Sequence, residues 1–324
     1  MDSTQLIAIF GSILLQSAPL IIAVCGETIS ERAGVINLSM DGSLLLSALA
    51  GFVAALLSGS LLLGFASAAA VGALMALIVA FGSLHLRQNQ VAIGFVLAML
   101  GDSLSAFLGQ SFTRLPGPSV PAMHIPILKD IPVLGPIFFR QDAVVYFALL
   151  LVAVTWWFLF RTRAGLELRS AGERPEAAFA RGVAVRKLRY LYAVLGGALV
   201  GIAGAAYSLD VKIGWAEGHT RGMGWIALAI VIFGGWSPVR GALGAVLFGA
   251  TKALATVLQR SFPQVALVAF NAVPWLLMIA VLLLVSGKLA APLLARPPAA
   301  WRRTLRGLLQ AAPPAALGDL LDDN

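Results

Sequence analysis

This 324-residue chain contains one cysteine, few charged residues and none of the short motifs that mark common enzyme sites. The single cysteine, Cys25, excludes an internal disulfide framework and any metal site built from cysteines. Charged residues make up 12% of the chain, against roughly 25% in an average soluble domain. These shortages exclude an ordinary soluble globular fold.

Groups that carry out chemistry are also scarce. The three histidines, His85, His124 and His219, fall in separate intervals and match no metal-binding spacing. The sequence has no G-x-S-x-G nucleophile elbow and no G-x-x-x-x-G-K-[ST] phosphate loop. We therefore expect the chain not to be an enzyme. If ATP drives its activity, another polypeptide must bind the ATP.

Long apolar runs are what the sequence does contain. Hydrophobic residues make up 59% of the chain, the mean hydropathy is +0.90, and the apolar residues fill windows of about twenty, the length that crosses a bilayer as a helix. The composition predicts an all-α polytopic membrane protein with about 8–10 transmembrane helices. The windows lie near 6–26, 43–59, 60–84, 91–110, 143–160, 189–209, 222–236, 238–258 and 265–286.

The basic residues indicate orientation in the membrane. The interval 161–189 holds eight Lys or Arg against three Glu, and short loops of this kind are retained in the cytoplasm. The net charge of +8 therefore gives no indication of nucleic-acid binding. We expect a transmembrane domain over 1–290, with the proline-rich loop 111–142 on the extracytoplasmic side. The cytoplasmic tail 291–324 is expected to be loosely ordered beyond Leu309.

A short helix is predicted inside the cationic interval, within Gly172–Gly182. Pro175 suits the first turn, where its missing N–H needs no partner. Glu173 and Glu176 favour the positive end of the helix, and Gly182 can end it. A surface helix beside a membrane bundle is a candidate docking site.

Several polar residues lie within or beside the apolar windows and are candidates for a solute path, because burying them is costly. Asp102 lies within 91–110, Asn89 stands at its start, and Asn271 lies in the last window. For Asp102 and Asn271 structural pairing is an equal alternative. Lys252 is more simply explained by snorkelling or by an ion pair.

The interval 26–42 carries another set of polar candidates between two spans, namely Glu27, Glu31, Asn37 and Asp41. Irregular backbone at membrane depth survives only where protein or a water-filled cavity satisfies it, and transporter sites are often built at such breaks. The competing interpretation, an ordinary solvated loop, is somewhat favoured at this point.

Three stretches resemble one family of permeases, in the expected order: GETISERAGVINLSMDGSLLLSALAGF from residue 26, GERPEAAFARGVAVRKLRYLYAVLGGALVGIAGA from 172, and GMGWIALAIVIFGGWSPVRGALGAVLFG from 222. The chain resembles the ribose/branched-chain amino acid permease superfamily of ABC importers, in its nucleoside and simple-sugar branch. The resemblance implies a type II-importer-like bundle in a bacterial inner membrane, with a cytoplasmic C-terminus and a cytoplasmic coupling helix in the segment 161–190.

The resemblance also implies partners. These are a cytoplasmic ABC ATPase that binds the ATP and Mg, a second permease that is either identical or a sister subunit, an extracytoplasmic solute-binding protein, and membrane lipid. It implies no cofactor in this chain and no nucleic-acid partner. The coupling residues would be Gly172, Glu173, Pro175, Ala177, Ala178, Phe179 and Gly182.

The solute implied is a nucleoside or simple sugar, with branched-chain amino acids less favoured. Phe95, Phe107 and Trp225 could stack on a base, although such residues more often face lipid or the core. The alternative function is a secondary transporter driven by an ion gradient, with Asp102 as its ion site. An intramembrane enzyme ranks third, since no acid–base or metal cluster is visible.

Overall fold

The computed structural model of the protein describes residues 3–123, 125–126, 128–261, 264, 267–285 and 312–319. In these ranges the chain is helical, with two isolated β-bridges and no named strand, which confirms the predicted all-α class. The elements are α1 (Ser3–Arg32), α2 (Met40–Ser58), α3 (Leu61–Leu84), α4 (Gln90–Gly109), η1 (Gln110–Phe112), η2 (Leu128–Asp130), η3 (Gly135–Phe139), α5 (Ala143–Arg161), α6 (Arg163–Glu173), α7 (Pro175–Ala180), α8 (Val185–Ala206), η4 (Tyr207–Val211), α9 (Met223–Phe233), α10 (Pro238–Ser261) and α11 (Leu267–Val285).

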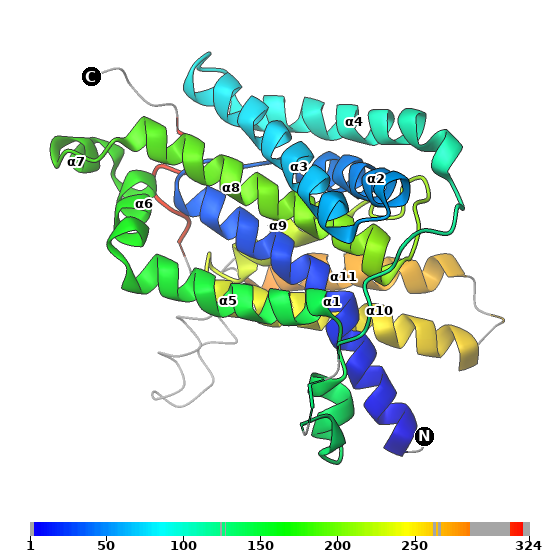
Figure 1. Ribbon diagram of the computed structural model, residues 1–324. Helices are drawn as coiled ribbons and strands as arrows, with labels where there is room; N and C mark the ends of the chain where they lie inside the picture. The colour runs from blue at the N-terminus through cyan, green and yellow to red at the C-terminus, as the bar shows by residue number, and fades with distance from the viewer. Residues whose placement is uncertain are drawn as a thin grey trace, which may run out of the picture.

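Each predicted apolar window coincides with a helix, and the protein is a multi-pass membrane protein. Within the described residues seven helices are long and apolar enough to cross a bilayer. The helix α9 has 11 residues, too few to cross alone. Figure 1 shows α1 between α5 and α8, with α3 on the other side of α8 and α4 against α2 and α3.

Glycine lets α8 approach its neighbours closely. Gly196 faces Gly26 of α1, and a side chain on either would collide with the backbone of the other. Gly72 of α3 similarly packs against Gly197 and Gly201. In lipid, where water does not drive apolar helices together, close backbone packing of small residues is a main source of association. The centre of the bundle is therefore held at α8.

The interval 26–42 differs from the solvated loop that was the favoured expectation. The helix α1 continues through Glu27 and Glu31 to Arg32, so that only residues 33–39 separate it from α2. Glu27, Glu31, Asn37 and Asp41 are all buried. The solvated interpretation is wrong, because α8, α9 and α4 cover this segment.

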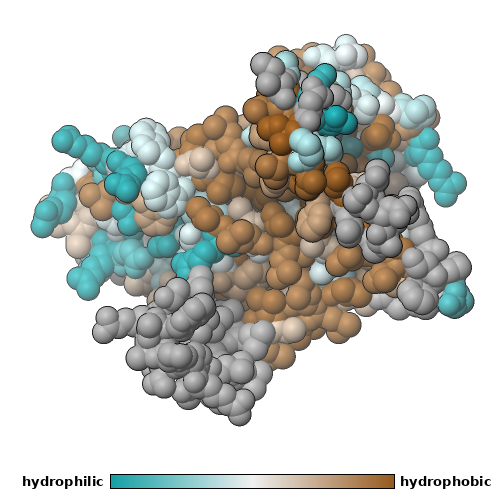
Figure 2. Space-filling model, turned by 90° about the horizontal axis from the view of Figure 1, so that it is seen from below, coloured by the Kyte–Doolittle hydropathy of each residue, from teal (hydrophilic) through white to brown (hydrophobic). Residues whose placement is uncertain are grey.

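One end of the bundle carries α6, α7 and most of the interval 161–189, and we call it the cationic end. Figure 1 shows α7 projecting from this end, and Figure 2 shows hydrophilic side chains gathered there beside an apolar belt. The predicted short helix is confirmed as α7, which begins at Pro175 and ends before Gly182, where φ is +85°. The helix α6 before it was not predicted.

The C-terminal tail also departs from expectation. Residues 312–319 lie against the cationic end and donate backbone hydrogen bonds to Gly172 and Gly34. Ala316 is 6% exposed. The expectation of loose order beyond Leu309 is therefore wrong for these eight residues, because a buried socket binds them.

The glycine packing of α8 yields a testable expectation. In Gly201→Ala the added methyl group would collide with the Ala68 carbonyl of α3, and overpacking of this kind costs about 1–3 kcal/mol. Gly11→Ala is the matched control, since its methyl group would first meet the Gln141 side chain at 3.4 Å. Thermal unfolding in detergent should show a lower Tm for Gly201→Ala only. Equal Tm values would contradict close packing of α3 on α8.

Candidate solute path and coupling surface

Two helices begin head to head inside the bundle. The start of α2 lies beside the middle of α4, where Gly42 packs against Ala98 and Gly101. The helix α9 starts at the same place and runs toward the cationic end, while α2 runs the other way. Asp41 joins them, because its Oδ1 accepts hydrogen bonds from Gly222 N at 2.8 Å and Gly224 N at 2.9 Å.

This arrangement is a helix cap supplied by another segment. The first N–H groups of a helix have no partner within it, and a carboxylate satisfies them while it balances the positive end of the helix dipole. Gly222 has φ +88°, a left-handed conformation that favours glycine, and a side chain on Gly224 would collide with the Asp41 backbone. The two glycines bring α9 close enough for Asp41 to cap it.

An ion pair stands beside the junction. Arg221, one residue before the α9 cap, donates to Asp102 Oδ1 of α4 from Nη2 at 2.9 Å and from Nε at 3.3 Å. The Asp102 and Arg221 side chains are 39% and 54% exposed although Asp102 lies near the middle of the span Gln90–Phe112. A charged pair at that depth requires water or protein around it rather than lipid.

Two of the three aromatic candidates meet on the same side of the molecule. The rings of Phe95 on α4 and Trp225 on α9 lie 6.1 Å apart at 47°. Phe95 is 52% exposed and lies seven residues, or two helical turns, before Asp102. Phe107 is 70% exposed and has no ring contact with this pair. The pair Phe95–Trp225 and the pair Asp102–Arg221 therefore share the α4–α9 face.

The acidic candidates on α1 form a second, enclosed cluster. Glu27 Oε1 accepts from Asn37 N at 2.9 Å, and Glu31 Oε2, one turn later, accepts from Trp236 Nε1 just after α9. Arg32 Nε donates to the Trp236 carbonyl at 3.0 Å. This cluster ties α1 to the segment 33–39 and to the turn that follows α9.

The remaining candidates for the solute path do not belong to either of these two clusters. Asn89 is the N-cap of α4, and its side chain accepts from Ala92 N at 3.1 Å. The neighbouring Gln90 is buried and its Oε1 accepts from Ile36 N at 2.9 Å. Asn271 falls in α11, but its side chain lies outside the described residues. Lys252 Nζ lies 5.5 Å from the Tyr207 ring.

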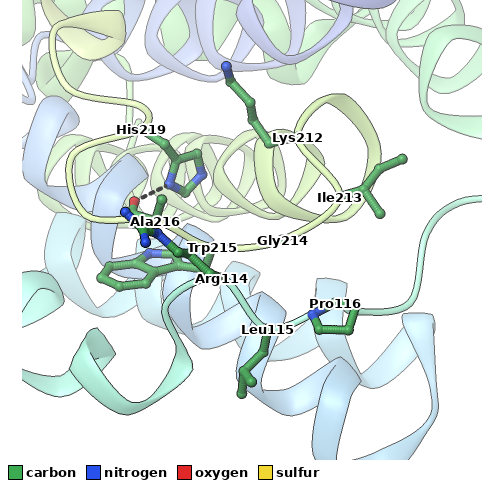
Figure 3. Close-up of a pocket in the computed structure, with 9 residues that line it drawn as sticks. All are labelled: Arg114, Leu115, Pro116, Lys212, Ile213, Gly214, Trp215, Ala216 and His219. Atoms are coloured by element: carbon green, nitrogen blue, oxygen red, sulfur yellow. Dashed lines mark hydrogen bonds between the residues drawn. The ribbon is translucent and has the colours of Figure 1, made fainter.

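A pocket of about 370 Å³ opens at the end opposite the cationic end (Figure 3). Its walls come from residues 114–116, residues 212–216 and His219, and a bridge between Thr113 and Trp215 holds the two segments together. His219 Nδ1 donates to the Ala216 carbonyl at 2.7 Å, so its Nε2 accepts from Ser208. Burial lowers the pKa of His219 to about 4, with Lys212 and Lys252 nearby acting in the same direction. The imidazole is therefore neutral at physiological pH.

The coupling candidates divide into a buried seat and an exposed tip. Gly172 packs against the Arg32 carbonyl, Glu173 pairs with Arg32 at 3.7 Å, and Ala178 is buried with Ala171 and Val185. Pro175 opens α7, and Gly182 follows it. Ala177 and Phe179 point outward, and Phe179 is 61% exposed. The tip of α7 thus presents a large apolar side chain on a firmly packed base.

Arg32, Arg221 and Trp236 are not among the functional residues predicted from the sequence. Each contributes through a partner more than a hundred residues away, and no local spacing reveals such a pair. The sequence offered one usable indication of such a pair. Arg221 stands just before the apolar window 222–236, and Asp102 lies inside another window, 91–110. The described residues contain no group of three or more His, Cys, Asp or Glu side chains able to hold a metal.

The cap of α9 can be tested by mutation. Asp41→Ala leaves the N–H groups of Gly222 and Gly224 without an acceptor, and each unsatisfied buried group costs about 1–3 kcal/mol. Asp41→Asn keeps an oxygen acceptor and should lose less. We expect thermal unfolding to rank wild type above Asp41→Asn and Asp41→Ala last. If Asp41→Ala unfolds at the wild-type temperature, Asp41 does not cap α9.

Known proteins resemble the chain over most of its length. The nucleoside ABC transporter permease NupC of Lactococcus lactis is 33% identical over 88% of this chain and 94% of its own. The guanosine ABC transporter permease NupQ of Bacillus subtilis is 34% identical over 90% and 96%. A protein of Haloferax volcanii assigned provisionally as a glucose ABC transporter permease is 44% identical over 72% and 73%.

No solved structure matches the fold. The sequence profile described as branched-chain amino acid transport system, permease component, matches residues 9–284, nearly the whole helical bundle. The family resemblance inferred from the three sequence stretches is thereby confirmed. The chain belongs to the family of branched-chain amino acid transport system permease components.

Proposed function

We propose that the chain is the permease subunit of a binding-protein-dependent ABC importer that moves a nucleoside or a simple sugar inward. The relatives named for nucleoside, guanosine and glucose transport support this solute class. The cationic end faces the cytoplasm, as its excess of Lys and Arg favours. ATP and Mg bind to a separate ATPase subunit, since this sequence holds no phosphate loop.

The observation that carries the proposal is the exposed tip of α7. Phe179 is a large apolar side chain on a six-residue helix that projects from the cationic end (Figure 1). Such a residue on a rigid base suits the groove of a soluble partner, because buried aromatic anchors dominate many interfaces. We assign this tip to the ATPase, a second permease to the membrane-embedded surface, and a solute-binding protein to the opposite end.

A continuous set of contacts links the tip of α7 to the helix junction. The base of α7 packs on α6, and Glu173 of α6 pairs with Arg32 of α1. Arg32 donates hydrogen bonds to the carbonyls of Gly235 and Trp236, which follow α9. The N-terminal end of α9 is capped by Asp41 of α2. Motion of α7 would therefore reach α9 through an ion pair and the hydrogen bonds that Arg32 donates. ATP can favour one access state only if these contacts differ between the states.

Docking at α7 is tested with Phe179→Asp. The variant places a charge at the tip without touching the buried base, and loss of an aromatic anchor costs about 2 kcal/mol or more. We expect the ATPase to stop co-purifying and ATP-driven uptake in liposomes to be lost. Phe179→Leu, which keeps an apolar tip, should retain both. Normal co-purification of the Asp variant, or gradient-driven uptake by the chain alone, would overturn the assignment.

We further assign the α4–α9 face to the solute path. Its ion pair needs water or protein around it at membrane depth, and a solute passing there would meet Asp102 and Arg221 beside the Phe95–Trp225 rings. Two helical turns separate Phe95 from Asp102, about 10 Å, which matches a nucleoside with its base on the rings and its sugar hydroxyls at the charges.

A charge exchange separates a role in the path from a structural role. Asp102→Asn and Arg221→Gln should each lower uptake about tenfold, with the ATPase still bound. The double variant Asp102→Arg with Arg221→Asp restores an ion pair and should recover the Tm. It should not recover uptake, because the solute then meets each charge in the wrong place. Full recovery of uptake would make the pair structural only.

A further inference from the structure

The tail peptide, residues 312–319, occupies a socket at the cationic end. Figure 1 shows it in red beside α6. Ala316 N donates to the Gly172 carbonyl at 2.9 Å, and Gly318 N donates to the Gly34 carbonyl at 3.2 Å. Ala315 N donates to Glu173 Oε2 at 3.2 Å. The peptide therefore bonds at once to the end of α6 and to the segment 33–39 between α1 and α2.

A buried arginine forms the floor of the socket. Arg189 of α8 is 0% exposed, and its guanidinium donates to the Asp319 carbonyl at 3.1 Å and the Ala316 carbonyl at 3.3 Å. It also donates to the Ala171 carbonyl of α6, at 3.1 Å. A buried charge without hydrogen-bond partners is strongly destabilising, so the tail supplies acceptors that Arg189 requires.

The backbone around the socket is shaped for this peptide. Gly34 has φ +96°, and a side chain there would collide with the guanidinium of Arg189. Gly318 has φ +81° in the turn of the tail, and Leu317 packs on the main apolar core. Left-handed positions of this kind favour glycine, on both the socket and the peptide. The backbone of the socket and the backbone of the tail peptide are therefore both shaped for this contact.

We propose that the tail peptide is a strap that fixes α6, the segment 33–39 and α8 together as one body, so that motion of α7 is passed to the bundle. This inference rests on the proposed function. The strap lies directly beside the Arg32–Glu173 contact through which the coupling route runs. With the strap released, α6 moves independently of α1, and ATP hydrolysis proceeds with less solute moved.

Two adjacent alanines provide a matched test. Ala316 is buried in the socket and Ala315 is exposed, so the same change to Arg ejects the peptide in one case only. In the full complex in liposomes, we expect Ala316→Arg to lower solute moved per ATP hydrolysed about tenfold, with the ATPase still bound. Ala315→Arg should match wild type. Gly318→Val, which strains the left-handed turn of the tail and crowds Ile36, serves if Ala316→Arg fails to fold.

Hydrogen exchange on the purified permease tests the seat of the strap without an ATPase. The amides of Ala315, Ala316 and Gly318 should be protected in wild type and in Ala315→Arg, and should exchange rapidly in Ala316→Arg. Rapid exchange in wild type would overturn the inference. So would an unchanged or raised ratio of solute to ATP when the peptide is released.

The two proposals fail in different ways. A wild-type complex without ATP-driven uptake would overturn the proposed function, and with it the coupling role of the strap. Protected tail amides would still place the peptide in its socket. A wild-type complex that imports solute normally, with Ala316→Arg equally efficient, would overturn the strap alone.

Discussion

Helix ends inside this bundle must satisfy their terminal backbone groups without bulk water, and the fold depends on how they do so. A carboxylate serves the positive end of α9, where Asp41 accepts from two N–H groups. Arginines serve negative ends: Arg32 binds the carbonyls after α9, and Arg189 binds a carbonyl of α6. The sign of each capping charge is the one that the helix dipole favours, negative at the N-terminal end and positive at the C-terminal end. Each charge also joins two segments far apart in sequence, so the caps serve as tertiary contacts.

The same caps place the coupling surface and the candidate path in one connected structure. Arg32 takes part in both, since it binds Glu173 beside α7 and the turn after α9. The helix α9 is short because it occupies only the space between Asp41 and that turn. A short helix held at both ends by charges from other segments can shift only if those segments shift with it. This is a physical basis for linking an event at α7 to the α4–α9 face.

The sequence was sufficient to predict what depends on local pattern. Windows of apolar residues located the spans, because a bilayer requires a fixed length of helix. Pro175 and Gly182 located α7, because each restricts the backbone at its own position. The burial of Glu27 and Asp41 was not predicted, since neighbours from α8 and α9 decide it. The ion pair of Asp102 with Arg221 and the socket of Arg189 depend on residues 119 and 130 positions apart. Hydropathy and charge counts contain no such information.

The position of the tail peptide along the chain has a consequence for biosynthesis. Arg189 is synthesised 127 and 130 residues before Ala316 and Asp319, whose carbonyls accept hydrogen bonds from its guanidinium. The spans before the tail can assemble while the chain is still being made, but the socket stays empty until residues 316–319 have left the ribosome. A chain that stops before residue 316 would leave the Arg189 guanidinium without these two acceptors. The strap is therefore added to a bundle in which α8 is already packed against α1 and α3.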